Sequence, residues 1–129
     1  MKIEHVAIWT HQLAEMRTFY ERYFNGRSNA KYTNPHTGFA SHFITFDDGA
    51  RLELMQMDGI APNPNTAVQQ HLGYIHLAMS VGSETAVDNL TEQLRHDGYQ
   101  VIGEPRTTGD GYYESVILDP DGNRIEITI

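Results

Sequence analysis

The sequence predicts an α+β protein built from two copies of one βαβββ module. Apolar residues recur with helical spacing in two segments and with strand-like alternation in several others. Short stretches also recur, since Glu4–Ile8 resembles Ile75–Met79 and Gly49–Leu54 resembles Gly122–Ile127. The histidines of these stretches are 71 residues apart and the glutamates 73, which indicates duplication of one module. We expect both copies to share a single domain over residues 1–129.

The first module is expected over about residues 1–57. Its strands are predicted at Ile3–Trp9, Ala40–Asp47 and Arg51–Met57. A helix is predicted over about Gln12–Asn25, because the apolar residues of this segment share one helical face. They are Leu13, Met16, Phe19, Tyr20, Tyr23 and Phe24. Thr10 can cap the start of this helix and Gly26 its end, and a polar loop follows.

The second module is expected over about residues 73–129, after a linker of residues 58–72 that has no clear periodicity. Its strands are predicted at Gly73–Val81, Tyr99–Ile102, Tyr112–Leu118 and Arg124–Ile129. A helix is predicted over about Glu84–His96, with Ser83 as its N-cap. The apolar face of this helix consists of Val87, Leu90 and Leu94. The second module therefore repeats the order of elements in the first.

Four of the predicted strands have an apolar face and, near the middle of the other face, one titratable side chain. These side chains are His5, Glu53, His76 and Glu126. The apolar faces are expected to pack on the two helices. A mixed sheet that curves away from the helices forms a cup with the helices on its convex side. The four titratable side chains would then line the hollow of this cup.

Two imidazoles and two carboxylates form a mixed nitrogen and oxygen ligand set for a divalent metal ion. Zn²⁺ and Ni²⁺ suit such a set, and so do Co²⁺, Mn²⁺ and Fe²⁺. A strand histidine can instead be a structural, hydrogen-bonded residue, and a glutamate on an open sheet face can simply be solvated. Arg51 and Arg124 could also pair with glutamates of neighbouring strands. Recurrence of both residue types at matching places in the two halves favours the metal site.

The composition excludes several other classes of protein. Acidic residues outnumber basic ones 17 to 9, and this net charge of −8 disfavours nucleic acid and anionic membranes as partners. The absence of cysteine excludes disulfides, thiolate metal sites and cysteine nucleophiles. The first residues lack the apolar core of a signal peptide, and no apolar run is long enough for a membrane span. We therefore expect a soluble cytoplasmic protein.

Several motifs resemble the vicinal oxygen chelate superfamily, which includes glyoxalase I, bleomycin resistance proteins and extradiol dioxygenases. They are Asp119–Ile127 at the C-terminal end, His5 in the first strand, Phe19 and Tyr20 in the first helix, and Gly73–Ala78. The resemblance is nearest to glyoxalase I-like proteins, which are related to lactoylglutathione lyase. It implies two βαβββ modules around a divalent metal ion, and a homodimer.

The resemblance also implies roles for individual residues. His5, Glu53, His76 and Glu126 occupy the positions of the metal ligands in glyoxalase I. Glu126 matches the catalytic base, with Glu53 as second ligand or partner base. The implied activity is a metal-dependent lyase or isomerase that abstracts a proton from a hemithioacetal or a related substrate.

Related activities in the superfamily stay open as alternatives. One is an epimerase, and another is a thiol transferase of the fosfomycin-resistance type. Because such transferases use two histidines and one glutamate, Glu53 discriminates against them. A third is a metal-free resistance protein that binds a small molecule. Glutathione is left open as the thiol, because Glu15 stands where glyoxalase I commonly has an arginine, although Arg17 lies close by.

Overall fold

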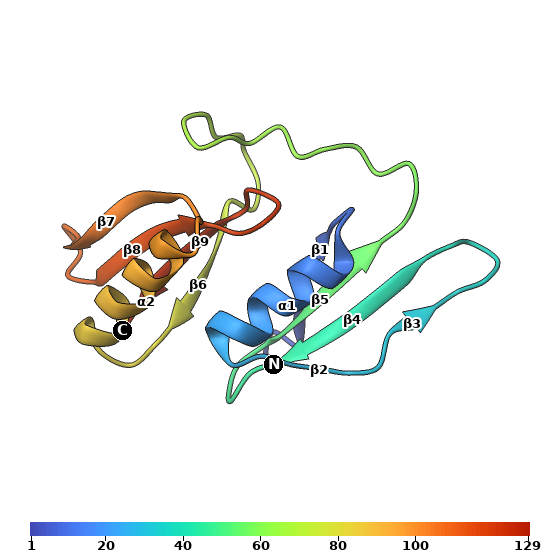
Figure 1. The fold of residues 1–129 in the computed structure, drawn as a ribbon, viewed down its shortest axis with the longest axis horizontal. Helices are drawn as coiled ribbons and strands as arrows, with labels where there is room; N and C mark the ends of the chain where they lie inside the picture. The colour runs from blue at the N-terminus through green and yellow to red at the C-terminus, as the bar shows by residue number, and fades with distance from the viewer. The chain divides into compact units, whose positions relative to one another are not determined.

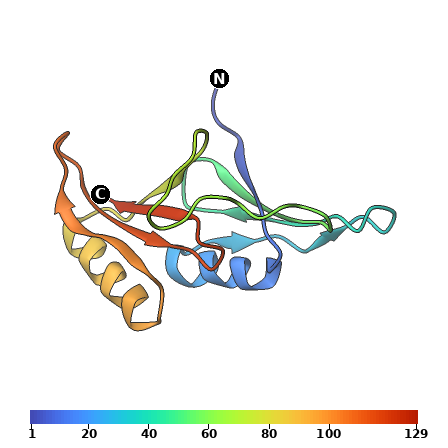
Figure 2. The ribbon, with the colours of Figure 1, turned by 90° about the horizontal axis from the view of Figure 1, so that it is seen from above.

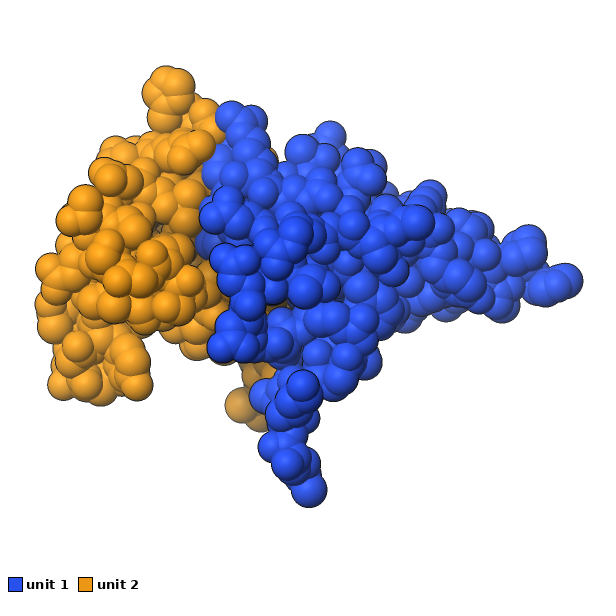
Figure 3. Space-filling view, turned by 90° about the horizontal axis from the view of Figure 1, so that it is seen from below, with its two compact units in different colours: residues 1–62 blue, residues 63–129 orange.

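The computed structural model describes residues 1–129 and divides them into two compact units, residues 1–62 and residues 63–129 (Figures 1 and 3). Each unit contains one long helix and one mixed β-sheet, which confirms the α+β class and the duplicated βαβββ plan. Residues 57–75 contain no helix or strand. Neither helix has the length and apolar composition that a membrane span requires.

The first unit consists of a five-stranded sheet and the helix α1. Its elements are β1 (His5–Trp9), α1 (Leu13–Phe24), β2 (Arg27–Ser28), β3 (Tyr32–Thr33), β4 (Ala40–Thr45) and β5 (Arg51–Gln56). The strand order is β1-β5-β4-β2, with β3 also paired to β4. Strands β1 and β5 are parallel, and the other pairs are antiparallel. We expected only a polar loop where β2 and β3 lie, because two-residue strands are too short to show an alternating pattern.

The second unit repeats this topology with four strands. Its elements are β6 (His76–Ser80), α2 (Glu84–His96), β7 (Val101–Thr107), β8 (Tyr113–Leu118) and β9 (Arg124–Thr128). The order is β6-β9-β8-β7, and β6 is parallel to β9. Strand β7 extends well beyond the short strand expected at Tyr99–Ile102. Its pattern is obscured by Pro105 and by two register shifts against β8, which an edge strand tolerates.

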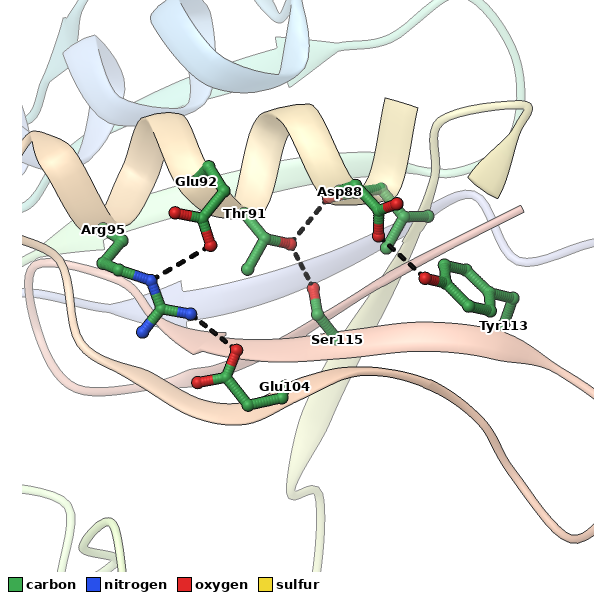
Figure 4. A network of polar contacts seen from close by, with 8 residues as sticks. Asp88, Thr91, Glu92, Arg95, Glu104, Tyr113 and Ser115 are labelled. Carbon is green, nitrogen blue, oxygen red and sulfur yellow. Dashed lines mark hydrogen bonds and ion pairs between the residues drawn. The ribbon is translucent and has the colours of Figure 1, made fainter. Parts of the chain in front are cut away.

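Each helix lies against its own sheet (Figure 2) and buries its apolar stripe there. All six apolar residues predicted for the buried face of α1 are buried. In α2, Val87 and Leu94 are buried as predicted, whereas Leu90 is only half-buried. The buried position next to it belongs to Thr91, whose hydroxyl donates to the Val87 carbonyl oxygen and accepts from Ser115 Oγ, both at 2.6 Å (Figure 4). A polar residue is tolerated at this core position because its hydroxyl is fully hydrogen-bonded.

Polar contacts also join α2 to the strands beneath it. The Tyr113 hydroxyl of β8 donates to Asp88 Oδ1 at 2.8 Å (Figure 4). Arg95 donates to Glu104 of β7 at 2.6 Å and to Glu92 of its own helix at 3.2 Å. These bonds lie at the rim of the helix–sheet contact, where exposed pairs contribute only modestly to stability.

Both caps of α1 differ from expectation, whereas the N-cap of α2 does not. The N-cap of α1 is Gln12 and not Thr10, although Thr10 Oγ1 accepts from Gln12 N at 2.9 Å. Ser83 caps α2 as predicted, and its hydroxyl accepts from Ala86 N at 3.2 Å. The prediction that Gly26 ends α1 is wrong, because Asn25 adopts the left-handed cap conformation at φ 53°. Gly26 meets a packing need instead, since a Cβ atom there would lie 2.5 Å from Ile44 Cγ2.

Candidate metal centre

The two parallel strand pairs place their candidate ligands in the same register. In the first unit, Ala7 of β1 is opposite Glu53 of β5, so His5 lies one diagonal step away from Glu53 on the same face. In the second unit, Ala78 of β6 is opposite Glu126 of β9, which gives His76 the same relation to Glu126. Each module therefore builds one histidine–glutamate pair by the same geometry.

The members of each pair are close together. His5 Nε2 lies 3.9 Å from Glu53 Oε2, and His76 Nε2 lies 3.3 Å from Glu126 Oε2. The two histidine side chains are 41% and 40% exposed, whereas those of Glu53 and Glu126 are 15% and 22% exposed. Each histidine is thus accessible from solvent, while each carboxylate is largely shielded from water.

The buried neighbours of the glutamates fix the face on which each pair lies. Leu52 and Leu54 flank Glu53 in β5 and are buried on the helix side of the sheet. Ile125 and Ile127 flank Glu126 in β9 in the same way. Since side chains alternate along a strand, both pairs lie on the sheet face that turns away from the helix of their own unit.

The first pair has additional polar and aromatic neighbours. His5 Nδ1 contacts the Glu4 carboxylate, which also forms an ion pair with Arg51. The hydrogen bond from His5, aided by Arg51, holds the pKa of the Glu4 carboxyl below its ordinary value. The Phe43 ring lies edge-on to the His5 imidazole, with 5.5 Å between centroids. The guanidinium of Arg51 stacks over the Phe43 ring, with Cζ 4.2 Å from the ring centroid.

The second pair lacks these neighbours. Ile75 precedes His76 and offers no carboxylate. Arg124, the counterpart of Arg51, donates instead to the carbonyl oxygens of Thr66 and Ala67, each at 2.9 Å. It thereby ties the irregular segment before β6 to β9.

The donor set of each unit suits a divalent ion but does not complete a site. An imidazole nitrogen and a carboxylate oxygen at these separations are ordinary ligands for Zn²⁺ or Ni²⁺. Within either unit, no cluster of three or more His, Asp or Glu side chains could hold a metal ion. The union of both pairs in one four-ligand centre stays a prediction of the sequence.

Sequence reasoning identified both pairs but missed Glu4 and Phe43. The signal for Glu4 was its place directly before His5, in a stretch that has no acid in the second copy. Phe43 gave no signal, because its contact with His5 depends on the pairing of β4 with β5.

The model of the Glyoxalase/Bleomycin resistance protein/Dioxygenase superfamily matches residues 2–127. The chain belongs to this superfamily. The match spans both modules and thus both histidine–glutamate pairs.

Solved structures of superfamily members share the fold. A mutant of glyoxalase I from Zea mays superposes with a TM-score of 0.79 at 20% identity, over 98% of this chain. Glyoxalase I of Leishmania major, described as trypanothione-dependent, gives 0.75 at 20% identity, over 99% of this chain and 86% of its own. A possible glyoxalase from Bacillus cereus gives 0.72 at 25% identity, over 100% and 99% of the two chains.

Two of the comparisons cover only part of the relative. This chain spans 44% of the maize glyoxalase I chain. It also matches an uncharacterised protein of Bacillus subtilis strain 168, YqjT, at 37% identity over 59 residues, which is 43% of this chain and 46% of the relative. At identities near 20%, the solved structures establish the fold of this chain and leave its reaction to be argued from its own residues.

Proposed function

We propose that this protein is a divalent-metal-dependent lyase or isomerase of the glyoxalase I type. Its substrate would be a small molecule with two neighbouring oxygen atoms, such as a hemithioacetal. The observation that supports the proposal best is the repetition of one histidine–glutamate pair, in identical register, in both modules. Superfamily membership over residues 2–127 supports it further.

The proposed centre consists of His5, Glu53, His76 and Glu126. A bound divalent ion would act as a Lewis acid and acidify the carbon-bound proton next to the substrate carbonyl. Glu126 removes this proton and returns it to the neighbouring carbon, and Glu53 serves as ligand or as partner base. The largely shielded carboxylates of both residues suit this task, because few water molecules compete for the transferred proton.

Metal content and substrate turnover test the proposal. We expect protein purified without added metal to contain Zn²⁺ or Ni²⁺ by elemental analysis. Removal of the ion should abolish turnover of a hemithioacetal panel that includes adducts of glutathione and of other thiols. Restoring Zn²⁺, Ni²⁺, Co²⁺, Mn²⁺ or Fe²⁺ should then recover it. Tight small-molecule binding by protein that never holds metal would overturn the proposal in favour of a binding protein.

The variant Glu126→Gln tests the assignment of the base. We expect kcat to fall by about 10²-fold or more while substrate still binds, because the amide cannot accept the proton. Glu92→Gln, which changes an exposed carboxylate on α2, is the matched control and should keep full activity. Full activity of Glu126→Gln with its metal retained would remove Glu126 from this role. Turnover of methylmalonyl-CoA or fosfomycin in place of a hemithioacetal would indicate the epimerase or thiol transferase instead.

A further inference from the structure

We infer that Glu4 is a positioning residue, which holds His5 with its proton on Nδ1 and leaves Nε2 available as the metal ligand. This inference rests on the proposed function for its purpose, and on the geometry around His5 for its content. Ionised carboxylate oxygens only accept hydrogen bonds. Since Glu4 contacts Nδ1, that nitrogen carries the proton and the lone pair lies on Nε2, the atom that faces Glu53 at 3.9 Å.

The Glu4 carboxylate is itself held in place. Arg51 lies directly opposite His5 in the strand register. Its guanidinium forms an ion pair with Oε1 of Glu4, the carboxylate oxygen that does not contact His5. The guanidinium of Arg51 stacks on Phe43, and the Phe43 ring packs edge-on against His5. A closed ring of contacts results, in which each side chain touches two others. Its members are Glu4, His5, Phe43 and Arg51. Such a ring restrains both the tautomer and the orientation of the imidazole.

The second module shows that this ring is a separate feature and not part of the duplicated plan. Ile75 stands in the place of Glu4, and Val116, opposite Glu126, stands in the place of Phe43. Arg124 is engaged by backbone carbonyl oxygens and not by a carboxylate. The two histidines are therefore inequivalent, because His5 has a carboxylate at Nδ1, whereas the carboxylate near His76 lies at its Nε2. His76 serves as an internal control in any experiment on His5.

The first experiment uses the metal-free protein. Long-range ¹H–¹⁵N NMR spectra report which ring nitrogen of each histidine is protonated. In the original chain we expect His5 to carry its proton on Nδ1. In Glu4→Ala we expect His5 to show a mixture of the Nδ1–H and Nε2–H tautomers. The spectrum of His76 should be the same in both proteins. Glu15→Ala removes another exposed carboxylate of the same unit and should leave His5 unchanged. An Nε2–H form of His5 in the unchanged chain, or no response to Glu4→Ala, would overturn the inference.

The second experiment titrates Zn²⁺ into the same proteins. Loss of a partner of a metal-bound histidine typically weakens metal affinity by about 10- to 100-fold, and we expect this for Glu4→Ala. Glu4→Gln should recover part of the loss, because its amide oxygen still accepts from Nδ1. An unchanged Zn²⁺ dissociation constant in Glu4→Ala would contradict the positioning role. Failure of the unchanged chain to bind any of the divalent ions would count against the proposed function alone, since the NMR result decides the role of Glu4 without metal.

Discussion

Asp119 shows how a single residue organises the turn between β8 and β9. Its carboxylate accepts from Asp121 N at 2.9 Å and from Asn123 N at 2.8 Å, and also from Asn123 Nδ2 at 2.9 Å. The residue is only 4% exposed. Burial raises the pKa of the Asp119 carboxyl from 3.8 to about 6, and the hydrogen bonds from Asn123 oppose this rise only in part.

A pH dependence of stability follows from this raised pKa. The folded state holds the Asp119 proton more tightly than the unfolded chain does. Protonation of Asp119 therefore stabilises the folded state fully below about pH 4, and this contribution is lost as pH rises through about 6. Because the side chain of Asp119→Asn does not titrate, the unchanged chain should lose up to about 3 kcal/mol relative to this variant between pH 4 and pH 7. Denaturant unfolding of both proteins across this range measures the difference. If the difference in free energy of unfolding stayed constant, or if the original chain gained stability relative to Asp119→Asn as pH rises, the raised pKa would be contradicted.

At the scale of elements, the packing of α1 on β4 depends on Gly26. A Cβ atom at this position would lie 2.5 Å from Ile44 Cγ2 and 3.0 Å from the Tyr20 carbonyl oxygen. Ile44 is fully buried and β-branched, so its methyl group has little freedom to move aside. The glycine is therefore needed for close approach of the helix end to the sheet.

The variant Gly26→Ala should destabilise the protein by about 1–3 kcal/mol through overpacking. Gly109→Ala is the matched control, because no atom lies within 4 Å of its added Cβ and its backbone is not left-handed. That variant should change the free energy of unfolding by less than about 0.5 kcal/mol. Equal stability of the two variants in thermal or denaturant unfolding would show that the sheet yields at Ile44.

The elements also show where sequence patterns succeed. Helix α2 has the predicted bounds and cap, because its periodicity and Ser83 are local signals. The alternation around Glu53 and Glu126 correctly separated buried from accessible faces. The patterns failed for β2 and β3, which are very short, and for β7, where Pro105 and register shifts interrupt the alternation.

At the scale of the whole molecule, large apolar side chains remain exposed outside the two cores. They are Met1, Ile3, Trp9, Tyr32, Val68, Leu72, Tyr74, Tyr112 and Ile129. In the first unit, Trp9 and Tyr32 both contact Phe39, with centroids 6.1 Å apart in each pair. Exposed aromatic clusters of this kind favour contact with another protein surface.

We therefore expect the chain to form a homodimer, as its resemblance to glyoxalase I-like proteins implied. Light scattering should give a mass twice the 14.6 kDa of one chain. Trp9→Ser, which removes an exposed ring of the aromatic cluster, should shift the equilibrium toward the single chain if this cluster lies in the interface. A mass near 14.6 kDa for the unchanged chain at micromolar concentration would contradict the dimer.

The amino-acid sequence by itself determined the α+β class, the duplication, and the sheet faces on which His5, Glu53, His76 and Glu126 lie. These properties follow from periodicity and from repeated letters, which are local along the chain. Only the tertiary structure decided that β1 pairs in parallel with β5, and β6 with β9, so that each histidine meets its own glutamate. It also decided the ring of Glu4, Arg51 and Phe43 around His5. Apart from the contacts of Glu4 with His5 and of Phe43 with Arg51, these contacts join residues about 40 or more positions apart. Their geometry depends on strand register, which no local pattern encodes.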